Sequence, residues 1–196
     1  NMTQRQIFLQ NLAQTSDFPL AIEIEKAEGI YLYGKTNKYM DLISGIAVSN
    51  VGHRHPKVVA AIKSQVDKYL HLMVYGEYIQ SPQVLLAQAL VNSTKIPTLN
   101  QVYFTNSGTE ALEGAMKLAK RYTGRTGFIS CINSYHGSSQ GALSLAGDEN
   151  FKNSFRPLLP NITHIVHGRE EDLVYINNKT AAIFIEIIGG ESGVRK

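Results

Sequence analysis

The sequence predicts an α/β fold: a mostly parallel sheet covered by helices, preceded by a helix and a small antiparallel meander. From residue 101 onward, strand-like and helical patterns alternate, and the strands are almost continuously apolar, as buried parallel strands are. Before residue 50, short alternating segments are separated by turns that contain glycine. These two patterns divide the chain into an N-terminal segment, residues 1–50, and a larger domain, residues 51–196.

The N-terminal elements follow from capping and from alternation of apolar and polar residues. Thr3 can cap a short amphipathic helix that carries Ile7, Leu9 and Leu12. Residues 20–27, 30–33 and 39–42 then predict three strands joined by turns, which is a meander.

The later elements follow from helical periodicity and apolar runs. His55-Pro56 and Ser81-Pro82 each predict a helix start, because proline fits the first turn of a helix. Beyond them we expect strands at 102–105, 127–132, 163–166 and 181–187, and helical stretches at 110–122, 139–145 and 170–177.

The composition narrows the class of protein. With 43% hydrophobic and 18% charged residues, the 196-residue chain has ample core material. Its net charge of +3 is scattered along the chain, which does not favour a nucleic-acid or membrane partner. The only cysteine, Cys131, permits no internal disulfide. We therefore expect a cytoplasmic protein, and no motif predicts a metal site.

The turn at residues 105–111 is the most informative motif. It follows an apolar strand-like segment and opens a helix, so free N–H groups and the helix dipole point at one spot. Ser107, Gly108 and Thr109 can then bind an anion, because the hydroxyls add donors and the glycine permits close approach. The alternative is an ordinary helix N-cap.

An ordered set of motifs resembles the class III aminotransferases, which are pyridoxal-phosphate enzymes of fold type I. The nearest-looking relatives are acetylornithine, ornithine and 4-aminobutyrate aminotransferases. The matching segments are residues 44–53, 55–56, 106–111, 117–120, 135–137, 143–145, 157–160 and 186–194. The resemblance implies that residues 1–50 belong to a small domain and that 51–196 are a truncated part of the cofactor-binding large domain.

The resemblance also implies roles for single residues at the cofactor. The Ser107–Thr109 turn would hold the cofactor phosphate, and Tyr135 would stack on the pyridine ring. His136 would support the cofactor site, and Glu186 would lie near the cofactor. Read alone, Tyr135 could equally be a core aromatic residue, and His136 an ordinary polar residue at a turn.

Two further residues are assigned to the substrate by the same resemblance. Glu191 matches a glutamate that pairs with an arginine near the substrate carboxylate, and Ile46 would add an apolar wall to the substrate pocket. Glu191 could otherwise be a solvated carboxylate in a glycine-rich loop. Leu112, Ile187 and Gly189 depart from residues common in the family, which weakens assignment to one substrate.

The chain is expected to be a fragment without a catalytic residue of its own. In the resembled family, the lysine that forms a Schiff base with the cofactor lies further downstream than Lys196. The aspartate on the pyridine nitrogen and the arginine for the substrate carboxylate also lie there. Because transamination needs the lysine both to hold the aldehyde and to move the proton, we expect the isolated fragment to be inactive.

The expected function is therefore that of an aminotransferase fragment. The complete enzyme would move an amino group from an amino acid or ω-amino donor to a 2-oxo acid, and we expect this acid to be 2-oxoglutarate. The enzyme would be a homodimer. An aminomutase or racemase of the same fold is one alternative. A non-catalytic module that binds a phosphate-bearing ligand is the other.

Overall fold

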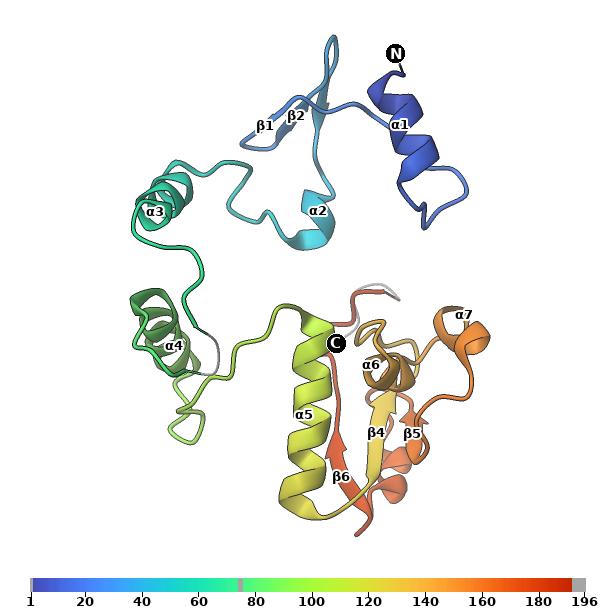
Figure 1. Cartoon of the computed structure of the whole chain (residues 1–196). Helices are drawn as coiled ribbons and strands as arrows, with labels where there is room; N and C mark the ends of the chain where they lie inside the picture. The colour runs from blue at the N-terminus through green and yellow to red at the C-terminus, as the bar shows by residue number, and fades with distance from the viewer. Residues whose placement is uncertain (1, 74–75, 192–196) are drawn as a thin grey trace. The chain divides into compact units, whose positions relative to one another are not determined.

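The computed structural model describes residues 2–73 and 76–191, and these form two compact units, Asn1–Gln80 and Ser81–Lys196 (Figure 1). Each unit is described by itself. The division falls later than the predicted boundary at residue 50. Assignment of residues 1–50 to a small domain concerns the whole protein and stays a prediction.

The first unit begins with helix α1 (Gln4–Asn11). Thr3 and Gln6 form a reciprocal capping box at its start, as the sequence predicts for Thr3. Strands β1 (Lys26–Glu28), β2 (Tyr31–Tyr33) and β3 (Lys38–Met40) then form an antiparallel sheet of order β1-β2-β3, which confirms the meander.

A short turn and a helix complete the first unit. The turn α2 (Ser44–Ala47) has four successive residues with φ between 52° and 62°, so it is left-handed. The Asp41 carboxylate accepts from the amides of Ile43 and Ser44 and pairs with His53 Nε2 at 2.7 Å, which ties the turn to the following loop. Helix α3 (Pro56–Val66) begins with proline in its first turn, as predicted.

The second unit contains the predicted parallel sheet. Strand β4 (Gly127–Cys131) lies between β5 (Ile162–Ile165) and β6 (Thr180–Ile183), and both pairings are parallel. The helical elements of this unit are α4 (Ser81–Thr94), α5 (Gly108–Thr123), α6 (Gln140–Leu145), α7 (Glu149–Lys152) and the 3-10 helices η1 (Asn153–Phe155) and η2 (Glu170–Tyr175).

The core lies where α5 and α6 pack against the sheet. Met116 of α5, Phe128 of β4 and Leu145 of α6 are almost completely buried and form one cluster. Leu112 and Ala119 pack on it from the same face of α5, because residues three and four apart share a helix face.

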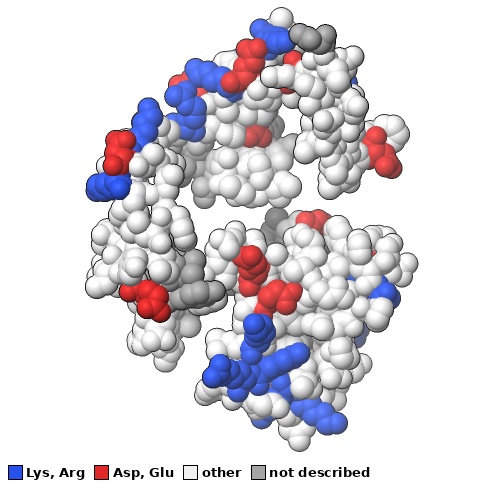
Figure 2. Space-filling model, viewed as in Figure 1, with Lys and Arg blue, Asp and Glu red and all other residues white. Residues whose placement is uncertain are grey.

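Helix α5 is fixed at both ends. Ser107 caps its start, and Gly124, with a left-handed φ of 67°, ends it by donating its N–H to the Lys120 carbonyl at 2.9 Å. Figure 2 shows acidic residues toward the start of α5 and Lys and Arg gathered over its C-terminal part. This distribution is favourable for the helix dipole.

Four predicted elements differ in the structure. The predicted strand 20–27 is a strand only from Lys26 onward, in β1. Residues 102–105 are not in a strand, and β6 ends at Ile183, so only the first half of 181–187 is paired. A strand needs a neighbouring strand for its hydrogen bonds. Within 2–73 and 76–191, no strand pairs with residues 102–105, and beyond Ile183 only the Phe184 amide still bonds to β4, at the Ile129 carbonyl, 2.8 Å away. Within the predicted helical stretch 170–177, Glu170–Tyr175 form the 3-10 helix η2. In the ranges that are described, no helix is both long and apolar enough to cross a bilayer.

We expect Met116→Ala to destabilise the folded protein by about 2–5 kcal/mol, because it leaves a cavity between α5, β4 and α6. Urea unfolding measures the free-energy difference. Leu118→Ala is the matched control on the same helix: Leu118 is 67% exposed, and the change should stay within about 0.5 kcal/mol. Similar losses for the two variants would contradict this packing.

Candidate functional site

Most predicted site residues lie at one edge of the parallel sheet. Only residues 124–126 join α5 to β4, so α5 runs antiparallel to the strand and its N-terminus lies at the carboxyl ends of β4 and β6 (Figure 1). Ligands of open α/β sheets bind at that edge.

The start of α5 offers three donors to an anion. Ser107 Oγ accepts from the Glu110 amide at 3.2 Å, which leaves the hydroxyl proton of Ser107 free to donate. The first helical bond runs from the Ala111 amide to the Ser107 carbonyl. Over the described part of the chain, the amides of Gly108 and Thr109 therefore have no acceptor, as expected for the first turn of a helix.

The hydroxyl of Thr109 is engaged elsewhere. Thr109 Oγ1 lies 2.5 Å from Ser139 Oγ and also accepts from the Ser139 amide at 3.1 Å. Thr109 thus joins the start of α5 to the residue that precedes α6.

The turn at residues 135–137 lies against the same first helical turn. Gly137 has φ 127°, and a Cβ at this position would lie 2.5 Å from Thr109 Oγ1. Both the backbone conformation and the close approach require glycine here.

Glu186 and Tyr135 are brought together. Glu186 Oε2 accepts from the Tyr135 amide at 3.3 Å, although the two residues are far apart in sequence. The Tyr135 ring meets Phe151 edge to face, with centroids 5.7 Å apart, and remains 40% exposed. A partly exposed ring beside a carboxylate at the sheet edge is available to a planar ligand.

His136 is held by a chain of hydroxyl groups. Ser134 Oγ donates to the Cys131 carbonyl at 2.7 Å, so Ser130 Oγ donates to Ser134 Oγ, at 3.1 Å. His136 Nε2 lies 3.0 Å from Ser130 Oγ and must then carry the proton. This chain leaves Nδ1 as the acceptor nitrogen.

His136 is kept neutral by its surroundings. Burial lowers its pKa below the ordinary value of 6.5, and the nearby Glu186 carboxylate opposes this effect without reversing it. The ring also packs edge to face on Phe184.

The two predicted substrate residues are not part of this group of contacts. Glu191 is exposed. Ile46 lies in the first unit, 83% exposed, in the left-handed turn α2. Left-handed φ values are strained for a β-branched residue, and such strain is often found at functional sites. Their roles stay predictions.

Four polar residues of the site were not predicted from the sequence: Glu113, Ser130, Ser134 and Ser139. Two signals could have found some of them. Glu113 is four residues after Thr109 on α5 and so shares its face. Ser139 directly precedes a helical stretch, the usual position of a cap.

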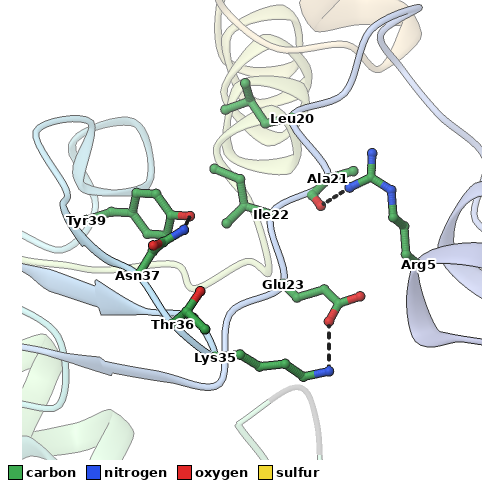
Figure 3. Close-up of a pocket in the computed structure, with 10 residues that line it drawn as sticks. Arg5, Leu20, Ala21, Ile22, Glu23, Lys35, Thr36, Asn37 and Tyr39 are labelled. Atoms are coloured by element: carbon green, nitrogen blue, oxygen red, sulfur yellow. Dashed lines mark hydrogen bonds and ion pairs between the residues drawn. The ribbon is translucent and has the colours of Figure 1, made fainter.

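A separate hollow lies in the first unit (Figure 3). Arg5 there donates to the Ala21 carbonyl at 3.1 Å, and Lys35 pairs with Glu23 at 3.4 Å. Its charged groups are thus partnered, and none of the predicted site residues lines it. We therefore favour the sheet edge.

Comparison with known proteins gives one consistent result. The family model "Aminotransferase class-III" matches residues 12–196. An acetylornithine aminotransferase of Methanopyrus kandleri is 41% identical over 160 residues, which are 81% of this chain and 40% of that protein. A putative [LysW]-aminoadipate semialdehyde/glutamate semialdehyde transaminase of Pyrococcus horikoshii is 38% identical, over 88% of this chain and 46% of that protein.

The fold comparison agrees. The taurine:2-oxoglutarate aminotransferase of Bifidobacterium kashiwanohense, solved in complex with PLP and glutamate, superposes with a TM-score of 0.84 at 30% identity. The match covers 96% of this chain and 48% of that one. The chain thus spans less than half the length of the relatives quoted.

We expect His136 to titrate below pH 6.5 in the folded protein. The pKa of His136 is lower in the folded protein than in the unfolded chain, where it is 6.5. Neutral His136 therefore makes its full contribution to folding stability above pH 6.5, and this contribution is lost as the pH falls through the folded pKa. NMR titration of the ring protons gives the midpoint. Unfolding of the wild type should also be more acid-sensitive than that of His136→Gln, and a midpoint at or above 6.5 would contradict the burial argument.

Gly137→Ala should be more destabilising than Gly168→Ala. Both glycines have positive φ, so both variants carry backbone strain, but only at position 137 does the new Cβ meet Thr109. We expect about 1–3 kcal/mol of additional destabilisation at 137, measured by urea unfolding. Equal effects would mean that the turn does not lie against α5.

Proposed function

We propose that the complete protein is a pyridoxal-phosphate-dependent aminotransferase, because the chain belongs to the class III aminotransferase family. It would move an amino group from an amino acid or ω-amino donor to a 2-oxo acid. The observation that carries this proposal is the free donor set at the start of α5, at the sheet edge, within a chain that matches the family.

The residues present fit the cofactor. Its phosphate would accept from the Ser107 hydroxyl and from the amides of Gly108 and Thr109, where the helix dipole adds positive potential. When bound, the cofactor supplies an electron sink for the carbanion formed at the substrate.

The other residues of the edge would orient the ring of the cofactor. Tyr135 would cover one face, with its backbone held by Glu186. His136, neutral and with Nδ1 as acceptor, would support the site without adding positive charge. Exclusion of water by Tyr135 would strengthen these polar contacts.

The substrate roles of Glu191 and Ile46 belong to this proposal. The 2-oxo acid would be 2-oxoglutarate, which the name of the Bifidobacterium enzyme gives as its own acceptor. We further propose a cytoplasmic homodimer. Relatives of similar identity bear different donor names, so the proposal stops at the donor class.

The lysine that forms the Schiff base is proposed to lie outside residues 1–196, so that the fragment alone is inactive. The buried Lys152 has a structural role instead. Its ammonium donates to the Ala146 carbonyl at 2.7 Å, just after α6, and lies 3.4 Å from Glu149. An ammonium that is hydrogen-bonded in this way has no free electron pair with which to attack an aldehyde.

We expect Ser107→Ala in the complete protein to weaken binding of pyridoxal phosphate about 10-fold or more, since a hydrogen bond to a charged group is worth ~1.5–3 kcal/mol. Binding of pyridoxal, which lacks the phosphate, should not change. Calorimetric titration measures both, and Ser64→Ala on α3 is the control for the same chemical change.

Equal weakening of both ligands would show that Ser107 does not contact the phosphate. Phosphate-dependent binding without amino transfer from any amino donor to a 2-oxo acid would instead favour the non-catalytic module. Isomerisation or racemisation of an amino compound would favour the aminomutase or racemase.

A further inference from the structure

Glu113 of α5 occupies the start of another helix. Its Oε1 atom accepts from the Ser139 hydroxyl at 2.6 Å and from the amides of Gly141 and Ala142 at 2.7 and 3.1 Å. The contact is tight: a Cβ on Gly141 would lie 2.3 Å from Glu113 Oε2.

The carboxylate replaces the usual cap of α6. Gly141 and Ala142 are the second and third residues of α6, whose amides normally bond to the side chain of the N-cap residue. That residue is Ser139, yet its side chain makes no capping bond. Glu113 takes both amides, and the Ser139 hydroxyl is free to turn toward α5.

The directions of these bonds follow from counting protons. A hydroxyl has one proton, and that of Ser139 goes to Glu113. The 2.5 Å contact between Thr109 and Ser139 must then use the Thr109 proton. The Thr109 hydroxyl consequently has no proton left for a phosphate.

We propose that Glu113 is a positioning residue for the phosphate site. Through Ser139 it fixes the hydroxyl of Thr109 and thereby the first turn of α5, so that Thr109 offers its main-chain N–H to the phosphate and not its hydroxyl. This proposal rests on the function proposed above.

The charge of Glu113 is consistent with this role. Partial burial would raise its pKa, but the Ser139 hydroxyl, the Ala142 and Gly141 amides and Lys117 together lower it. The residue is therefore ionised near neutral pH and acts only as an acceptor, as the proton count requires.

Loss of Glu113 would release the hydroxyl bonds of this chain. The Ser139 hydroxyl would turn back to cap α6, and Thr109 would keep only the bond from the Ser139 amide, which leaves its hydroxyl proton uncommitted. Because both groups act through one chain, Glu113→Ala and Thr109→Val should each weaken binding of pyridoxal phosphate by ~5–20-fold, and the double variant should be no worse than either.

The test measures dissociation constants of pyridoxal phosphate and pyridoxal for the complete protein. We expect only the phosphate-bearing ligand to be affected. Glu113→Gln, whose amide oxygen can still accept, should stay within about threefold of the wild type. Glu113→Asp keeps the charge but is one methylene shorter, and should behave like Glu113→Ala.

The outcomes separate this proposal from the one on which it rests. A wild-type protein that does not distinguish the two ligands would overturn the proposed function. If the wild type does distinguish them, additive effects of Glu113→Ala and Thr109→Val, or equal losses for both ligands, would overturn the role of Glu113 alone. Should Glu113→Ala not fold, the comparison of the Gln and Asp variants decides.

Discussion

The rest of the second unit depends on the parallel pairing of β4 with both of its neighbours. Phe128 is opposite Ile162 of β5 and Ala182 of β6, so the three strands end at one edge. The short connection to α5 makes that helix begin at the same edge. Parallel pairing therefore brings together groups that are 50 to 80 residues apart in the chain, and direct contacts such as that of Glu186 with the Tyr135 amide then join their loops.

Two chains of hydrogen-bonded hydroxyls complete the edge, and each ends on a group that can only accept. One runs from His136 through Ser130 and Ser134 to a backbone carbonyl, and the other from Thr109 through Ser139 to a carboxylate. Because the last group of each chain can only accept, every hydroxyl proton along the chain has a fixed acceptor. The groups that remain free to donate to a ligand are therefore determined before the ligand binds. Preorganisation of this kind removes part of the entropic cost of binding.

The sequence was sufficient to predict the structure wherever that structure depends on residues that are close together in the chain. Thr3 and Ser107 are caps because a cap is a local interaction, and the meander and the strand-helix order follow from periodicity. Residues 102–105 could not be settled in the same way, since a strand also needs a partner. Glu113 was missed because its bonds reach Ser139 and Gly141, and the helical spacing that places it on the face of Thr109 does not show which residues of another helix it contacts.

The order of the strands in the sheet also bears on how the chain is made. β4 emerges from the ribosome before either neighbour, and β6 follows it by ~50 residues, or ~3–10 s of synthesis at usual rates. Until then Phe128 is covered by α5, α6 and Ile162 of β5, without Ala181, Ala182 and Phe184. A long-lived nascent chain with an incomplete sheet exposes unpaired strand edges. Chaperones recognise such edges, and aggregates form by pairing through them. Glu113 joins α6 to α5, and all of its partners have been synthesised by residue 142. The two helices can therefore cover one face of the incomplete sheet early.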